Sequence, residues 1–179
     1  TLERAGQRTT VTAKHVVVAT GGKSIPKMGA SGIGYDIAKQ FGHTLTETRP
    51  ALVPFTFSDA PFAPMSGTAL PTRATAGGTS FDEATLFTHR GLSGPAMLQI
   101  SSYWHEGEAI TVNLIPDMAL YETLRDQRQT TGRRDLTTEL ARLLPARLVD
   151  HLTPEMGLSG RLADQSNAAL QDLCDRLSN

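Results

Sequence analysis

The residues best suited to phosphate chemistry in this chain follow a pair of glycines. Gly22-Lys23-Ser24 has the ending of a phosphate-binding loop, but that loop needs another glycine five residues before Gly22, where Val17 stands. Pro26 and Gly29 also oppose the helix that would begin directly after such a loop and bind the phosphate at its N-terminus. We therefore reject a phosphate-binding loop at this position.

A second place with reactive residue types is Gly91-Leu92-Ser93-Gly94-Pro95, which is similar to the sharp turn that presents a nucleophilic serine in hydrolases. That motif requires a glycine where Pro95 stands. His89 could act as a base for Ser93, but the spacing identifies no acidic partner. A turn followed by a helix N-terminus accounts for Ser93 and Gly94 without catalysis. A hydrolase is thus a distant alternative, and the catalytic residues are unknown.

Side chains that commonly bind metals are dispersed along the chain. The five histidines show no recognisable metal-binding spacing, and no metal site is predicted. We interpret His89 and Arg90 as a solvated strand end. The single cysteine, Cys174, excludes an internal disulfide, and it falls on the apolar face of the last helical segment. We expect it to behave as a small buried hydrophobic residue.

Composition narrows the class of protein. The 179 residues include 17 Lys or Arg and 18 Asp or Glu, a net charge of −1, which gives no electrostatic case for a nucleic acid or a membrane as partner. Hydrophobic residues make up 39% of the chain, as in a soluble globular protein, and we expect a cytoplasmic location. Because the chain starts without Met and without a signal-peptide pattern, we expect it to be a piece of a longer protein.

The strongest local signal for a ligand is the run from Val16 to Ala19, which stops at Thr20-Gly21-Gly22. A short continuous apolar run predicts a strand that is buried on both faces of a parallel sheet. Cofactors bind beyond the carboxyl ends of such strands, and glycines there let the backbone approach a ligand closely. The alternative is an ordinary connection between a strand and a loop.

The rest of the chain is predicted to be α+β. Residues 9–13 and 44–48 are expected to be strands, with a helix at 35–41 between them. The pattern changes near Pro50, so we predict domains at 1–49 and 50–179. Within the second, residues 50–116 should be mainly antiparallel β and residues 117–179 helical. Its expected strands are 51–57, 68–76, 80–89 and 109–115, with a turn at Gly77-Gly78, a turn at 91–95 and a helix at 96–104.

Leucine spacing in the last third predicts amphipathic helices. Asp117 and Asp135 are expected to cap two of them, and Pro145 to break or kink the second. A final helical segment is expected over 159–179. The side chains predicted to be buried are Leu140, Leu143, Leu148, Leu170 and Leu173.

Taken together, three stretches closely resemble the YhiN/BaiN-like family of bacterial NAD(P)/FAD-dependent oxidoreductases. The first runs from Val17 through Ala19-Thr20-Gly21-Gly22-Lys23 to Ala38 and continues through Phe41-Gly42-His43 to Arg49-Pro50-Ala51-Leu52-Val53-Pro54. The second is residues 86–95, and the weaker third is 143–148. The resemblance covers essentially the whole chain, in order.

The resemblance implies a flavoprotein with an inserted domain. Residues 1–49 would be part of the FAD-binding domain, and residues 50–179 most or all of the insert. Ala19, Thr20, Gly21 and Gly22 would lie close to FAD in the intact protein. NAD(P)H would be the reductant, the acceptor is unknown, and the remainder of the flavoprotein would be the partner of this chain.

The sequence also departs from the family pattern. The Gly-x-Gly-x-x-Gly fingerprint that binds the ADP half of FAD is absent, as is the later segment that closes the FAD site. We therefore expect the chain alone to bind no FAD and to be inactive. The alternative for this piece is a binding or structural module, without catalysis, that covers a site formed elsewhere.

Overall fold

The computed structural model describes residues 1–179, which divide into two compact units, Thr1–Arg49 and Pro50–Asn179. Each unit is described by itself below. None of the helices combines the length and the apolar character that crossing a membrane requires.

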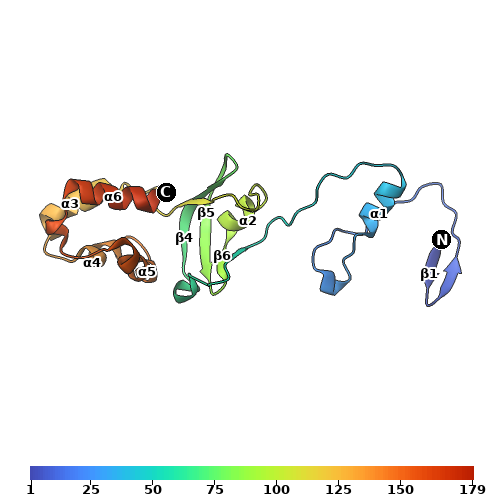
Figure 1. Ribbon diagram of the computed structural model, residues 1–179, viewed down its shortest axis with the longest axis horizontal. Coiled ribbons are helices and arrows are strands. Elements are labelled where there is room, and N and C mark those ends of the chain that lie inside the picture. The colour runs from blue at the N-terminus through green and yellow to red at the C-terminus, as the bar shows by residue number, and fades with distance from the viewer. The chain divides into compact units, whose positions relative to one another are not determined.

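The first unit contains little regular structure (blue in Figure 1). Strands β1 (Leu2–Arg4) and β2 (Gln7–Thr9) form an antiparallel hairpin, η1 (Pro26–Met28) is a short 3-10 turn, and α1 (Ile33–Gln40) is its one α-helix. The helix confirms the expectation for residues 35–41. No residue of this unit is buried, so it has no hydrophobic core of its own.

Three strand predictions in the first unit are wrong. Residues 16–19 form no strand, and the side chains of Val16 and Val17 are 80% and 88% exposed. A strand buried on both faces needs a neighbour at each edge and a layer on each face, and the chain provides neither. The strand expected over 9–13 ends at Thr9, and residues 44–48 form no strand.

The second unit begins with a five-stranded antiparallel sheet. Its strands are β3 (Phe55–Thr56), β4 (Ala69–Ala76), β5 (Thr79–Thr88), β6 (Gly91–Ser93) and β7 (Thr111–Asn113), in the order β3-β6-β5-β4-β7. The turn at Gly77-Gly78 joins β4 and β5, as predicted, because both glycines take a positive φ. The mainly antiparallel arrangement of 51–115 is confirmed.

Several boundaries in this region differ from the expectation. The strand predicted over 51–57 is only two residues long, and the turn predicted over 91–95 contains β6. Helix α2 (Pro95–Ile100) is shorter than the predicted 96–104. It packs against β4 and β5, where the alternate residues Ala74 and Ala76 leave room for it.

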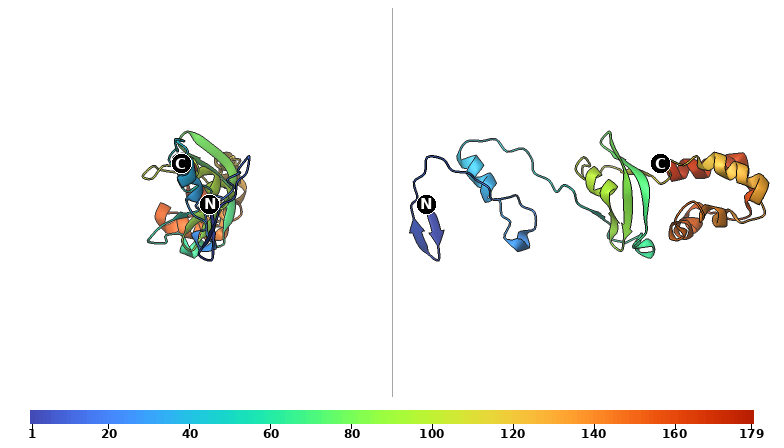
Figure 2. Two further views of the ribbon diagram at one scale, coloured as in Figure 1. Left: turned by 90° about the vertical axis from the view of Figure 1, so that its right-hand side faces the viewer. Right: turned by 180° about the vertical axis from the view of Figure 1, so that it is seen from behind.

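The remaining residues are helical, as predicted. The helices are α3 (Leu120–Thr131), α4 (Leu136–Leu140), α5 (Ala146–Met156) and α6 (Asn167–Ser178), with the 3-10 turns η2 (Ala63–Met65) before β4 and η3 (Leu162–Asp164) before α6. Helices α3 and α6 pack against each other, which Figure 2 shows from behind. The preceding helix α4 already ends at Leu140, and Pro145 is the N-cap of α5.

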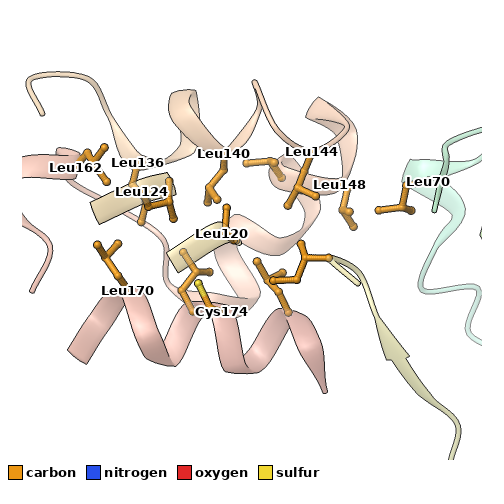
Figure 3. Packing of buried hydrophobic residues seen from close by; sticks show 14 of the residues in the cluster. Leu70, Leu120, Leu124, Leu136, Leu140, Leu144, Leu148, Leu162, Leu170 and Cys174 are labelled. Atoms are coloured by element: carbon orange, nitrogen blue, oxygen red, sulfur yellow. The ribbon is translucent and has the colours of Figure 1, made fainter. Parts of the chain in front are cut away.

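A leucine-rich core holds these helices together (Figure 3). Leu140, Leu148, Leu170 and Leu173 are buried as predicted, but Leu143 is only partly buried and Leu144 takes the core position instead. The Cys174 side chain lies in the same core. Leu70, from β4, belongs to this cluster too, so the sheet and the helices share it.

Two helix starts differ from the predictions. The N-cap of helix α3 is Ala119 rather than the predicted Asp117. No side chain makes a capping hydrogen bond at the start of this helix. Asp135 occupies the N-cap of α4, but its side chain makes no capping bond either. The last helix begins only at Asn167, where the Ser166 hydroxyl accepts a hydrogen bond from the backbone N–H of Ala169.

Candidate functional site

The turn formed by Ala19, Thr20, Gly21 and Gly22 packs against the first turn of α1. A Cβ on Gly34 would lie 2.6 Å from the Thr20 Oγ1, and a Cβ on Gly22 would lie 3.4 Å from the Tyr35 hydroxyl. Glycine at 34 is therefore what lets α1 approach the turn so closely.

The other side of this turn is open. Gly21 has a φ of +70°, and a Cβ built on it would meet no atom within 4 Å. The backbone N–H groups of Thr20, Gly21 and Gly22 donate to no backbone carbonyl of the chain. An open turn of small residues with free N–H groups can receive the polar edge of a ring or a chain of oxygens. It fits a contact with part of FAD.

The rest of an FAD site has no counterpart in the first unit. Lys23 follows the turn, and its Nζ lies 5.4 Å from the centre of the Tyr35 ring in the first turn of α1. No glycine fingerprint precedes the turn, and residues 10–18, directly before it, form no strand. The residues present therefore fit one contact with the cofactor, and the whole of the ADP half needs groups that this chain lacks.

An apolar cavity of about 990 Å³ lies next to the turn within the first unit. Val16 and Val18 line it from one side, and Ile37 and Phe41 of α1 line it from the other. These are the same-face residues that would cover a sheet if neighbouring strands were present.

The second reactive-looking motif is explained by packing. Ser93 lies in β6, where it pairs with Leu86, and no hydrogen bond joins it to the exposed His89. A Cβ on Gly94 would lie 2.6 Å from the Ala84 carbonyl oxygen, and one on Gly91 would overlap the Phe55 carbonyl oxygen. The two glycines thus allow close backbone packing, and the hydrolase alternative receives no support.

No group of three or more His, Cys, Asp or Glu side chains in the structure could hold a metal ion. Cys174 is buried between helices, and burial raises the pKa of its thiol to about 11, with smaller effects from Asp175 and Glu122. A protonated, buried thiol is a poor nucleophile and a poor metal ligand. The interpretation of Cys174 as a buried hydrophobic residue is confirmed.

Sequence reasoning missed an aromatic cavity of about 690 Å³ in the second unit. Phe55 and Trp104 meet edge to face on its wall, with ring centres 5.3 Å apart, and Phe57, Phe62 and Phe87 continue the lining. His151 and Glu155 also line it. Aromatic residues far apart in the sequence form this wall, so only the concentration of phenylalanine at 55–62 could have indicated it.

The second unit is an α+β domain with an antiparallel sheet and a helical region. Residues 49–179 match the family model described as "HI0933-like protein barrel and H2TH domain". The chain belongs to this HI0933-like family of flavoproteins, as its resemblance to the YhiN/BaiN-like oxidoreductases predicted.

Three curated relatives are similar to this chain. The ribosomal RNA dihydrouridine synthase of Escherichia coli K12 is 44% identical over 93% of the chain, and that of Haemophilus influenzae Rd is 42% identical over 90%. The 3-dehydro-bile acid delta(4,6)-reductase of Clostridium scindens is 34% identical over 59% of the chain. The chain spans 44%, 41% and 29% of the lengths of these three relatives, respectively.

Proposed function

We propose that this chain is part of a longer FAD-dependent oxidoreductase, to which it supplies one turn of the flavin site and a separate domain. The observation that carries the proposal is the 44% identity across almost the whole chain to a relative more than twice as long. The open Thr20–Gly22 turn supports it, because a flavin contact needs small residues and free N–H groups at one place.

When bound, FAD would supply hydride transfer from NADH or NADPH to the acceptor. The chain's own residues have binding roles in this proposal. Gly21 keeps the turn open for the cofactor, and Gly34 lets α1 support the turn from behind. No side chain of the chain is assigned a catalytic role, since Ser93 and Cys174 are both held in packed structure.

The acceptor that we propose is a carbon–carbon double bond conjugated to a carbonyl group. Uridine has such a bond in its base, and making dihydrouridine adds a hydride and a proton across it. A 3-dehydro-delta(4,6) steroid has double bonds conjugated to its 3-oxo group. The names of the relatives therefore share one reaction class, and the carbonyl stabilises the charge that develops when hydride arrives at the far carbon.

Of these acceptors, we favour a uridine of ribosomal RNA. The two relatives with that name match the chain at higher identity and over more of its length than the steroid reductase does. Proposed action on ribosomal RNA also agrees with the expected cytoplasmic location.

Charge is unevenly divided along the chain. Residues 1–49 contain seven Lys or Arg and three Asp or Glu, whereas residues 50–179 contain ten and fifteen. The expectation of no nucleic-acid partner rested on the net charge of −1 for the whole chain. That value averages over the two units and does not reflect the positive charge of the first unit. The excess of positive charge in that unit favours a polyanion near the flavin turn.

A second candidate function concerns residues 50–179 alone. This domain would act as a module that covers or presents the acceptor without taking part in the chemistry. Gly91 and Gly94 serve backbone packing in this domain, which favours this role for the piece, and the role is compatible with flavin chemistry in the longer protein.

The proposal is tested with the full-length protein, FAD, NADPH and a protein-free ribosomal RNA transcript. After the reaction, the RNA is digested and its nucleosides are analysed by mass spectrometry. We expect a nucleoside heavier than uridine by two hydrogens, formed only with NADPH or NADH present. Oxidation of the nicotinamide by a steroid enone, with no change in the RNA, would refute the RNA acceptor. Purified protein without flavin would refute the oxidoreductase.

A further inference from the structure

Both edges of the five-stranded sheet are unpaired. Strand β3 pairs only with β6, and β7 pairs only with β4. The outer backbone groups of an edge strand are free to pair with another strand, and proteins usually cover or shorten such edges. Here two short edge strands remain, one at each end of the sheet order.

The two edges line the same aromatic cavity. Phe55 and Thr56 of β3 and Thr111 and Val112 of β7 all contribute to it. Phe57, next to β3, is 42% exposed. Apolar side chains in an open groove between two free strand edges form a surface that gains free energy when a further element covers it.

Several polar groups of the groove are already paired within the domain. The Trp104 Nε1 donates to the Glu108 carbonyl oxygen at 2.7 Å, and the Thr85 and Thr72 hydroxyls are hydrogen-bonded at 2.7 Å. Among the lining residues, the His151 Nε2 lies 3.4 Å from the Glu155 Oε1. A small-molecule site needs a few polar groups that converge on the ligand, and this groove keeps few of them free. What it does keep free is backbone at its two edges.

We propose that the groove is filled by a β-strand from the part of the flavoprotein that the longer relatives have and this chain lacks. That strand would pair with β7, β3 or both, and alternate side chains would pack on Phe55, Trp104 and Val112. Two observations select this occupant. The matching family is described as a barrel, whereas these five strands leave the sheet open, and the chain spans less than half of its relatives. Closing a barrel removes the free edges.

The test compares amide hydrogen exchange in the 179-residue chain and in the full-length protein. We expect the edge-facing amides of β7 and β3 to exchange at least about tenfold more slowly in the full-length protein. Strand β5, which has a neighbour on each side, is the internal control and should change much less. Equal exchange of β7 and β3 in the two proteins would overturn the proposal.

A second measurement uses Trp104, the one tryptophan of this chain. Acrylamide should quench its fluorescence in the 179-residue chain and should quench it much less in a full-length variant in which any other tryptophan is replaced by phenylalanine.

The hydrogen-exchange experiment is also repeated with uridine and with a steroid enone. If β7 becomes protected only when one of these is added, the groove is a ligand site and the proposal is wrong. Neither readout depends on flavin content or activity, so it is independent of the proposed function.

Discussion

The Oγ1 of Thr20 lies 2.6 Å from the position that a Cβ would take on Gly34, so the glycine-rich turn and the first turn of α1 are in direct contact. This contact fixes one side of the turn and leaves the side at Gly21 open. The proposed flavin contact follows from that asymmetry, because a ligand can approach from one direction only.

The 179-residue chain alone should bind no FAD. A dinucleotide is held mainly through a glycine fingerprint, a helix N-terminus and an acidic residue on the ribose, and this chain offers one turn. Each tenfold loss of affinity is only about 1.4 kcal/mol, so losing several contacts removes binding. Titration of the chain with FAD, followed by flavin fluorescence, should show no saturable change. Binding at micromolar FAD would mean that the chain holds more of the site than its turn.

Replacing Gly94 by Ala should destabilise the second unit by about 2 kcal/mol or more. Gly94 has a φ of +92°, and its new Cβ would lie 2.6 Å from the Ala84 carbonyl oxygen, which cannot move without disturbing β5. Gly78→Ala is the control, because Gly78 has a φ of +75° with open space around it, and it should cost about 1 kcal/mol. Urea unfolding measures both. Equal losses would show that the Gly94 contact is unimportant.

Arg134 should contribute more to the free energy of unfolding than an ordinary surface arginine does. Its Nη1 lies 2.9 Å from the Oε1 of Glu139, a carboxylate that is only 1% exposed. Arg134→Ala leaves that carboxylate with Arg142 at 3.8 Å, and we expect a loss of about 2 kcal/mol, because half of the Arg134 side chain remains in water.

Two variants serve as comparisons for Arg134→Ala. Arg125→Ala removes an exposed ion pair with Asp126 and should change the free energy of unfolding by less than about 0.5 kcal/mol. Adding Glu139→Gln to Arg134→Ala should recover part of the loss, since the buried charge is then gone. If the double variant is less stable than Arg134→Ala, the Arg134–Glu139 pair is not the reason for the loss.

Cys174 should make stability fall at alkaline pH. Burial raises the pKa of its thiol in the folded protein to about 11, above the value in an unfolded chain. The unfolded state therefore loses this proton first, and the stabilisation present below about pH 8.5 is lost as the pH rises toward 11. The stability of the native chain relative to Cys174→Ala should decline by about 2 kcal/mol over that range. Parallel pH profiles of the two proteins would contradict this.

The sequence predicts well where local chemistry decides the structure. The β4–β5 hairpin follows from alternation on both sides of Gly77-Gly78, and the helices after residue 117 follow from leucine spacing. The wrong secondary-structure predictions share a cause. The structure of these segments depends on neighbouring strands that are far along the chain or absent from it. Residues 16–19 have strand composition without neighbouring strands, and Gly91–Ser93 becomes a strand only because β3 and β5 flank it.

The candidate site was predictable in part. The glycines at 21 and 22 after an apolar run, with the family resemblance, identified the turn. The support from Gly34 could not be predicted, since it depends on how α1 packs against Thr20. The aromatic groove was missed because Phe55 and Trp104 meet only after the whole sheet has formed.

The flavin content of two full-length variants, Gly21→Val and Gly42→Val, tests the central claim most directly. Both glycines have a positive φ, +70° and +79°, and neither Cβ would meet an atom of the chain within 4 Å, so the backbone strain is matched. We predict that Gly42→Val retains FAD at the native stoichiometry and that Gly21→Val, with its side chain on the open face of the turn, retains almost none. Equal FAD content in the two purified variants would contradict the placement of the flavin at the Thr20–Gly22 turn.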